Sequence, residues 1–237
     1  MTATLRETVI HWLLPQTCAG CREDLPKGWD APLCAACQGA LPPAEPPFCL
    51  RCAERVDGSS PHCAACSSRL SACRMIRAAF LYKGPIPPLV HAFKYRGRVG
   101  AARWAGQKMA QAFARYPELS GFDALVPVPL HRLRLRERGY NQADLLAAEL
   151  SASTGLPVWQ AVTRVEATRP QWRLDRGERL KNLAGAFRGQ AQARGRKLLL
   201  IDDVCTSGAS LEGCAKALQQ AGAAQVCAYV LARQTPR

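Results

Sequence analysis

The pattern of apolar positions predicts an α/β domain in the C-terminal part of the chain. Leu198–Ile201 is a continuous apolar run, which is typical of a strand buried on both faces of a parallel sheet. Val226–Leu231 predicts a second strand, and Leu125–Val128 predicts another earlier in the chain. Between the first two strands a helix is predicted, with one face formed by Leu211, Ala215, Leu218 and Gly222. The order strand, helix, strand indicates a βαβ unit and a Rossmann-like parallel sheet.

The N-terminal third of the chain shows no such pattern. It contains few large apolar residues, so we expect it to lack a core of its own. It also contains several prolines, namely Pro42, Pro43, Pro46, Pro47 and Pro61. No segment approaches the ~20 apolar residues that a membrane-spanning helix needs, and Val9–Leu14 is too short for the apolar region of a signal peptide. We therefore expect a cytoplasmic protein without membrane insertion.

Composition and charge divide the chain at the same place. The chain has 237 residues, 48% of them hydrophobic and 21% charged, which is ordinary for a globular protein. The net charge is +14, and it is uneven, since residues 1–73 hold 6 Lys/Arg against 7 Asp/Glu and residues 74–237 hold 26 against 11. Nine of the 12 cysteines also precede residue 74. Two modules are predicted, at residues 15–73 and 74–237.

Eight of the early cysteines form four Cys-x-x-Cys pairs. The pairs are Cys18 with Cys21, Cys34 with Cys37, Cys49 with Cys52, and Cys63 with Cys66. Two such pairs can close one tetrahedral Cys₄ zinc site, so the eight residues predict two structural zinc ions. A structural zinc contributes about 10–16 kcal/mol in small peptides, enough to replace the missing core. Disulfides would need an oxidising compartment, and a redox Cys-x-x-Cys would occur once rather than four times.

The pairing of these knuckles is open from the sequence. The proline-rich stretch Leu41–Phe48 favours sequential sites, but interleaved sites and a single zinc ion remain alternatives. Cys73 is left over and is interpreted as a structural thiol. The module lacks the basic stripe that phosphate contact requires, so we expect a structural or protein-docking cap rather than a nucleic-acid reader.

The strongest chemical motif follows the predicted strand Leu198–Ile201. Asp202 and Asp203 are adjacent carboxylates at the predicted strand end, and the small residues Thr206, Ser207, Gly208, Ala209 and Ser210 then open the predicted helix. Small residues at a helix N-terminus let N–H groups converge on a phosphate, whereas paired carboxylates suit the hydroxyls of a ribose or a metal-bound oxygen. Ligands bind open parallel sheets at this edge. The motif therefore indicates a site for a phosphorylated sugar.

This motif resembles the phosphoribosyl-pyrophosphate (PRPP) motif of type I phosphoribosyltransferases, with Ser207 where threonine is usual. Further segments resemble the ComF family (ComFC, GntX-like), and with the four knuckles the resemblance covers nearly the whole chain. These segments are Ala79–Pro85, Phe93–Gly97, Val126–Arg132, Arg136–Gln142, Thr168–Gln171, Arg176–Arg179 and Asn182–Phe187. The resemblance implies a type I phosphoribosyltransferase domain behind a double zinc ribbon.

The resemblance also implies roles for residues. Asp202 and Asp203 would hold the ribose hydroxyls of PRPP, residues 206–210 its 5′-phosphate, and Mg²⁺ would accompany the pyrophosphate. His131–Arg138 carries many cations, of which Arg132 and Arg138 are expected to bind pyrophosphate, although its alternation also fits a strand with one solvated side. A loop at Glu166–Asn182 would cover the site, with Arg179 as a catalytic residue. Its expected ligand contacts are Arg169, Gln171, Arg176, Arg179 and Asn182.

Two functions of different class follow. In the first, the protein is a phosphoribosyltransferase that transfers phosphoribosyl from PRPP to an unidentified acceptor, and the resemblance implies support of natural transformation or of the use of exogenous DNA. In the second, it is a non-catalytic module that senses PRPP, handles single-stranded DNA or docks other DNA-uptake or recombination proteins.

Cys205 beside the loop is expected to face the sheet interior rather than act as a nucleophile.

Overall fold

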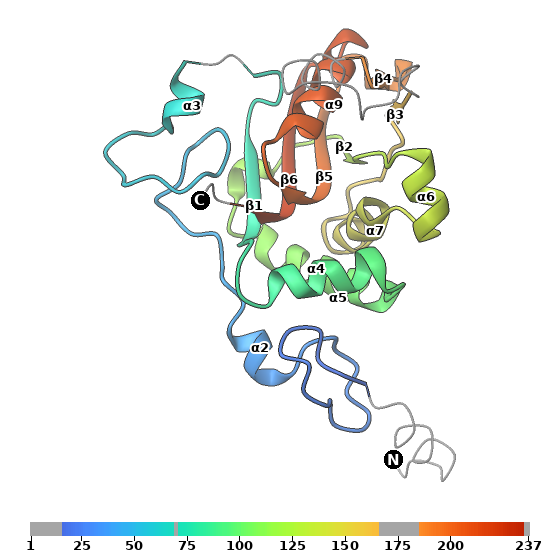
Figure 1. The fold of residues 1–237 in the computed structure, drawn as a ribbon. Coiled ribbons are helices and arrows are strands. Elements are labelled where there is room, and N and C mark those ends of the chain that lie inside the picture. Colours follow the sequence, from blue (N-terminus) through green and yellow to red (C-terminus); the bar gives the residue numbers. More distant parts are fainter. Residues whose placement is uncertain (1–15, 69–70, 166–184, 235–237) are drawn as a thin grey trace, which may run out of the picture.

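The computed structural model describes residues 16–68, 71–165 and 185–234. Its centre is a four-stranded parallel sheet with the strand order β1-β6-β5-β2 (Figure 1). The strands are β1 (Ile76–Leu81), β2 (Ala124–Pro127), β5 (Lys197–Cys205) and β6 (Gln225–Arg233). The predicted parallel sheet is confirmed, and β5 runs beyond its apolar residues so that Asp202 still pairs with Val230 of β6.

Helices cover both faces of this sheet. Leu199 and Ile201 of β5 point to one face, where they join a core with α4, α5 and α7. Leu198 and Leu200 point to the other face and pack with α9. This period of two is the reason for the continuous apolar run in the sequence. The helices are α4 (Ile86–Tyr95), α5 (Val99–Phe113), α7 (Gln142–Thr154) and α9 (Ala209–Gln220).

Helix α9 follows the predicted pattern over most of its length. Leu211, Ala215 and Leu218 are buried on one face, as predicted. The prediction is wrong for Gly222, because the helix ends at Gln220 and Gly222 lies in the following turn with φ of +93°. A glycine suits that turn, since other residues rarely adopt such a φ.

Several short elements surround the sheet. Strands β3 (Val162–Arg164) and β4 (Phe187–Gly189) pair antiparallel. A Cβ on Gly189 would lie 2.4 Å from the carbonyl oxygen of Ala217, so β4 lies directly against α9. The remaining elements of this part are η1 (Pro117–Leu119), α6 (Arg132–Arg138) and η3 (Ala191–Ala193). Residues 132–138 are thus helical, and the strand alternative is wrong.

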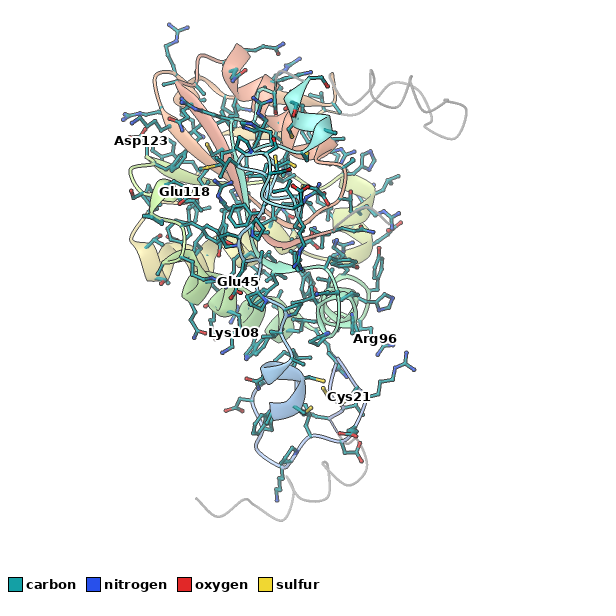
Figure 2. The ribbon with its side chains drawn as sticks, turned by 90° about the vertical axis from the view of Figure 1, so that its left-hand side faces the viewer. Cys21, Glu45, Arg96, Lys108, Glu118 and Asp123 are labelled. Carbon is teal, nitrogen blue, oxygen red and sulfur yellow. The ribbon has the colours of Figure 1, made fainter. Side chains whose placement is uncertain are left out.

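The cysteine-rich part forms two small lobes with a short helix in each, α2 (Ala35–Gly39) and α3 (Ala64–Ser67). We call residues 16–40 the first ribbon and residues 48–68 the second ribbon. The first ribbon lies beyond α4 and α5, and the second lies beside β1 (Figure 1). Figure 2 shows the first ribbon, with Cys21, as a projecting lobe.

The proline-rich segment between the ribbons runs along the free edge of β1. The N–H of Leu81 donates to the carbonyl of Pro42 at 2.8 Å, and the N–H of Ala44 donates to the carbonyl of Ala79 at 3.1 Å. The segment therefore covers a sheet edge that would otherwise be exposed.

Among the helices of the described residues, none combines the length and the apolar character needed to cross a lipid bilayer.

Candidate functional site

The first four cysteines converge on one point. The Sγ atoms of Cys18, Cys21, Cys34 and Cys37 all lie within 4.8 Å of one another. Tetrahedral zinc with Zn–S bonds of about 2.3 Å requires sulfur–sulfur distances of about 3.8 Å, and the Sγ atoms of Cys21 and Cys34 are 3.7 Å apart. Four thiolates at this spacing fit zinc.

Backbone N–H groups prepare Cys18 for this role. Its Sγ accepts hydrogen bonds from the N–H of Gly20 at 3.4 Å and of Cys34 at 3.2 Å. Burial raises the pKa of the Cys18 thiol, but these N–H groups, together with the backbone and side chain of Cys21, outweigh burial and bring the pKa down to about 6. These hydrogen bonds therefore favour the thiolate of Cys18, the form that binds metal, whereas burial and the neighbouring cysteines raise the pKa of Cys37 to about 12.

The second cluster repeats the first. Cys49, Cys52, Cys63 and Cys66 hold their Sγ atoms within 4.8 Å of one another, and those of Cys52 and Cys63 are 3.6 Å apart. The structure therefore pairs the knuckles sequentially, which was the favoured alternative. The leftover Cys73 is buried, as expected, and its thiol donates to the carbonyl of Met75.

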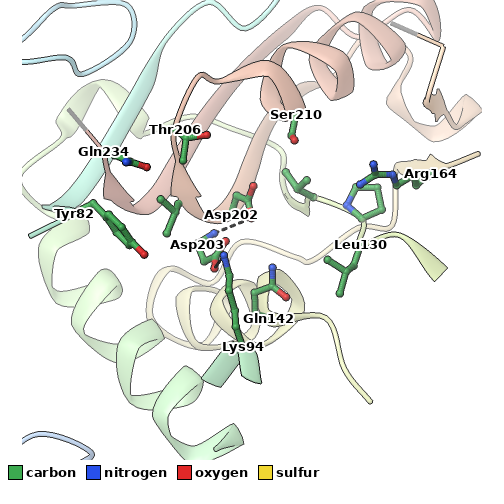
Figure 3. Close-up of a pocket in the computed structure, with 13 residues that line it drawn as sticks. Tyr82, Lys94, Leu130, Gln142, Arg164, Asp202, Asp203, Thr206, Ser210 and Gln234 are labelled. Carbon is green, nitrogen blue, oxygen red and sulfur yellow. Dashed lines mark hydrogen bonds and ion pairs between the residues drawn. The ribbon is translucent and has the colours of Figure 1, made fainter. Parts of the chain in front are cut away.

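The predicted sugar-phosphate site is a cavity of about 320 Å³ at the carboxyl ends of β5 and β2 (Figure 3). Both members of the acidic pair line it, together with two hydroxyl residues of the loop that opens α9. The lining residues are Tyr82, Lys94, Val128, Pro129, Leu130, Gln142, Arg164, Asp202, Asp203, Val204, Thr206, Ser210 and Gln234.

The two acids are not equivalent. Asp203 is buried, and its Oδ2 lies 2.5 Å from Nζ of Lys94. This contact is an ion pair without the alignment of a hydrogen bond, since Oδ2 has no hydrogen-bond donor among the described residues. Asp202 is half-buried, and its Oδ1 accepts the N–H of Asp203 at 2.8 Å. Burial and the neighbouring carboxylate of Asp203 raise the pKa of Asp202 well above its usual range.

The loop after β5 turns sharply into α9. Gly208 precedes the helix with φ of +75°, a left-handed conformation that only glycine adopts readily. Thr206 and Ser210 line the cavity, whereas Ser207, Gly208 and Ala209, the first residue of α9, are not among its lining residues. The Oγ of Ser207 accepts the N–H of Ala209 at 3.4 Å. The hydroxyls and the helix N-terminus thus face the same cavity as Asp202.

The predicted pyrophosphate residues lie outside the cavity lining. Helix α6 has no buried residue, and Arg132 is exposed on it. Arg138 donates to Oε1 of Gln142 at 2.5 Å, and its guanidinium lies 5.5 Å from the ring centroid of Tyr95. Arg138 therefore reaches the cavity only through Gln142.

Two cations that the sequence reasoning did not assign line the cavity instead. Lys94 comes from the end of α4, and Arg164 from the end of β3. Lys94 belongs to a segment already matched to the family, so that match could have identified it. Arg164 stands two residues before the segment Glu166–Asn182, which lies outside the described residues with its members Arg169, Gln171, Arg176, Arg179 and Asn182.

Cys205 is buried beneath the loop, as expected. Burial raises the pKa of its thiol to about 11, even though Arg233 acts in the opposite direction. A thiol with that pKa is almost entirely protonated at neutral pH and is therefore a poor nucleophile.

Comparison with known proteins gives two kinds of match. Residues 9–73 match the double zinc ribbon domain family. Over the length of the chain, competence protein F of Haemophilus influenzae is 30% identical over 223 residues, which cover 91% of this chain and 96% of that protein. The DNA utilization protein YhgH of Escherichia coli is also 30% identical, covering 93% of this chain and 98% of that protein.

Solved structures match part of the chain more distantly. Glutamine PRPP amidotransferase from Bacillus subtilis matches with a TM-score of 0.42 and 14% identity, covering 59% of this chain and 30% of that one. Hypoxanthine phosphoribosyltransferase from Trypanosoma cruzi matches with a TM-score of 0.36 and 12% identity, covering 57% of this chain and 64% of that one. The predicted fold class, a parallel α/β sheet domain with an N-terminal double zinc ribbon, is confirmed.

Proposed function

The chain belongs to the ComF family of competence protein F and the DNA utilization protein YhgH, and from this premise we propose that it binds PRPP with Mg²⁺ and transfers the phosphoribosyl group to an acceptor. The proposed role is in the uptake or use of exogenous DNA, and it is supported by relatives named a competence protein and a DNA utilization protein. The proposed location is the cytoplasm, because the eight thiolates that hold zinc must stay reduced.

One observation carries the proposal. Asp202 and the hydroxyl residues Thr206 and Ser210 line a single cavity beside the N-terminus of α9. A carboxylate accepts hydrogen bonds from ribose hydroxyls, and a helix N-terminus with free N–H groups attracts phosphate. PRPP presents both groups, two hydroxyls on the ring and a phosphate on C5, so the cavity matches the two ends of this sugar.

The two acids have different proposed roles. Asp202 contacts the ribose hydroxyls directly, because it is the more exposed of the pair. Oδ2 of Asp203 is paired with Lys94, and its other carboxylate oxygen is the proposed acceptor of a hydrogen bond from the ribose. Mg²⁺ enters with the pyrophosphate as part of the substrate, and carboxylate oxygens such as those of Asp202 are ligands that this hard cation prefers.

The reaction requires charge stabilisation more than proton transfer. The bond between the anomeric carbon and pyrophosphate breaks, its electron pair leaves with pyrophosphate, and a lone pair of the acceptor forms the new bond before the acceptor loses its proton. Lys94 and Arg164 line the cavity and are the cations we assign to the departing pyrophosphate. Arg138 orients Gln142. Arg132 is proposed only for the approach of the polyanion, and Arg179 as a catalytic residue outside the described part.

Calorimetry and pyrophosphate release test this proposal. The zinc-loaded full chain should bind PRPP with Mg²⁺, and it should release pyrophosphate when purine, pyrimidine or ammonia acceptors are supplied. Asp202→Asn should abolish release. Asp123→Asn is the matched control, because it removes a carboxylate at the opposite end of β5 while its Oδ2 contact with the N–H of Lys197 can persist. Absence of PRPP binding by the unsubstituted chain would overturn the proposal, and binding without turnover would favour a sensing module.

A second candidate function, handling of single-stranded DNA, is favoured by the surface beside the cavity. Tyr95 is 60% exposed at the end of α4, and the guanidinium of Arg138 covers its ring. Exposed Arg134 and Leu133 continue the surface along α6. An exposed aromatic ring among arginines suits base stacking and backbone contact.

This candidate has its own test. Binding of a single-stranded oligonucleotide should weaken as salt rises, and Tyr95→Ala should weaken it by about tenfold, within the range of one base–aromatic stack. Lys197→Ala removes an exposed cation at the other end of the sheet and is the control. Equal losses in both variants would leave only nonspecific attraction to a basic protein, against this candidate.

Docking of other DNA-uptake or recombination proteins is proposed for the ribbons, which lack a basic stripe.

A further inference from the structure

The last residue of β6 holds the phosphate loop from behind. Nη1 of Arg233 donates to the carbonyl of Cys205 at 2.9 Å and also to the carbonyl of Thr206. Arg233 is buried, and these two carbonyls belong to the turn that carries Thr206 into the cavity. The guanidinium therefore fixes the backbone of the loop although it does not line the cavity.

The partner of this guanidinium comes from the second ribbon. Nη2 of Arg233 lies 2.8 Å from Oε2 of Glu54, with both side chains largely buried. Glu54 follows the zinc ligand Cys52 by two residues, and its carbonyl accepts the N–H of the zinc ligand Cys49 at 2.6 Å. Glu54 is thus built into the turn that holds the second metal site.

We propose that the second ribbon positions the phosphate loop through Glu54 and Arg233, so that metal binding at Cys49, Cys52, Cys63 and Cys66 orders the loop. Arg233 is a positioning residue in this scheme, because it acts through the carbonyls of Cys205 and Thr206. The inference rests on the proposed function only for the identity of the ligand, since order in the loop can be measured without it.

Burial is the reason that the link is strong. A buried guanidinium needs an anion, and Nε of Arg233 already lacks a hydrogen-bond partner among the described residues. Without the carboxylate of Glu54 the charge would have no anion, only the two loop carbonyls and the Sγ of Cys205, so it would move toward water. The loop that it holds would then lose its support.

A second contact joins the same two parts. Glu212 lies in the first turn of α9, and its carboxylate accepts the hydroxyl of Ser71 at 2.6 Å and the N–H of Ala72 at 3.0 Å. These residues follow the second ribbon along the chain. The start of α9 and the loop before it are therefore both attached to the side of the molecule where the second ribbon lies.

The first ribbon has no comparable link among the described residues. It contacts the body through Cys18, Leu25 and Leu33, which pack in one core with α4 and α5. Nη1 of Arg98 also donates to the carbonyl of Thr17 at 3.1 Å, at the start of α5. Neither contact involves the loop before α9. The projecting lobe with Cys21 lies beyond the helices (Figure 2). Two sites with the same ligand chemistry therefore differ in their connection to the cavity, and each is a control for the other.

The body also offers a matched control for the ion pair. Arg77 and Glu118 form a similar pair at 2.6 Å, and Nη1 of Arg77 donates to the carbonyl of Leu50 in the second ribbon at 2.8 Å. This pair lies near the start of β1, and among the described residues neither side chain hydrogen-bonds to residues 205–210. Glu118→Gln therefore disturbs an equivalent attachment of the ribbon without touching Arg233.

Hydrogen exchange of the amides of residues 205–210 tests the inference on the full chain, with zinc content measured in parallel. Glu54→Gln should retain both zinc ions and accelerate exchange of these amides by about tenfold, a usual size for coupling between two sites, and weaken binding of PRPP with Mg²⁺ similarly. Glu118→Gln should leave both unchanged. Cys52→Ser should reproduce the effect of Glu54→Gln, and Cys21→Ser should not.

Two results would overturn the inference. One is unchanged exchange in Glu54→Gln, and the other is equal acceleration in Cys21→Ser and Cys52→Ser, which would mean general destabilisation. Glu54→Gln keeps all eight zinc ligands, so the test stands even where a cysteine variant does not fold. If the unsubstituted chain binds no PRPP, the proposed function fails while the exchange measurement still decides the link.

Discussion

The ammonium of Lys94 lies 2.5 Å from Oδ2 of Asp203, and this ion pair distinguishes two carboxylates that are adjacent in the sequence. Asp203 is the buried member, so its charge needs a cation nearby. Asp202 is left to face the cavity, and only its backbone neighbour donates to it among the described residues. The pair thus consists of one acid held by the protein and one available to a ligand.

Removing Lys94 should therefore destabilise the fold. Lys94→Met would leave the buried carboxylate of Asp203 unpaired, and we expect a loss of about 2 kcal/mol in the free energy of unfolding, below the 3–5 kcal/mol of a fully buried pair because Lys94 is 21% exposed. Urea unfolding measures the change. The double variant Lys94→Met with Asp203→Asn should recover most of the loss, since both charges are then absent. If the double variant instead loses as much stability as Lys94→Met and Asp203→Asn lose in sum, the ion pair does not stabilise the fold.

The raised pKa of Asp202 predicts how stability depends on pH. Because burial and Asp203 raise this pKa in the folded chain, the folded state keeps the proton to a higher pH than the unfolded state does. The contribution of Asp202 to stability is therefore favourable at low pH and is lost as the pH rises from the unfolded pKa of about 4 through the folded pKa.

Asp202→Asn checks this sign, because asparagine carries no charge at any pH. The variant should be more stable than the unsubstituted chain at neutral pH, by about 1 kcal/mol, which is usual for relieving strain at a functional site. Its advantage should shrink toward pH 4. Thermal unfolding between pH 4 and pH 8 measures the stability difference between the variant and the unsubstituted chain. A difference that favours the variant less at pH 8 than at pH 4 would contradict the prediction.

The elements that the sequence predicted are those with a strong local pattern. The apolar runs of β5 and β6 left no other arrangement than a buried parallel pair, and the Cys-x-x-Cys spacing sufficed for the zinc ligands. The helix at Arg132–Arg138 was less predictable, because alternating Arg and Leu fit a strand equally well when no residue is buried. Which knuckles pair depended on the path of the proline segment along β1, a tertiary contact.

The candidate site was predicted only in part for the same reason. Asp202 and the loop are adjacent in the sequence, and their chemistry could be inferred together. Lys94 and Arg164 reach the cavity from α4 and β3, more than 35 residues from the motif, so only the fold brings them to it. The acidic pair also looked symmetric until the ion pair with Lys94 distinguished its members.

Metal content should follow the two clusters independently. The full chain should carry two zinc ions, and Cys21→Ser should release one of them, since each cluster has its own four ligands. Stripping both ions with a chelator should expose residues 16–68 to protease, because these residues depend on metal rather than on a core of their own. Metal analysis and limited proteolysis measure the two effects. A stripped chain whose ribbons still resist protease would contradict the assignment of structural zinc.

Gly208 separates a cost to the fold from a cost to the site. A Cβ at this position would meet Sγ of Cys205 at 3.7 Å and Cδ1 of Ile76 at 3.8 Å, which are ordinary contacts. The cost of Gly208→Ala therefore comes from its φ of +75° and should be about 1 kcal/mol in the free energy of unfolding. Gly155 has nearly the same φ, +74°, at the end of α7 and has open space around its Cα.

The two glycine variants should thus lose similar stability in urea unfolding and differ in ligand binding. Gly208→Ala should also weaken binding of PRPP with Mg²⁺, because relief of the strained φ would rotate the N–H groups that open α9 away from the phosphate. Gly155→Ala should bind normally, since α7 ends far from the loop along the chain. Calorimetric titration of both variants against the unsubstituted chain measures this. Equal affinity in all three would mean that the turn before α9 does not bind the phosphate, and that the helix N-terminus must be removed from the proposed site.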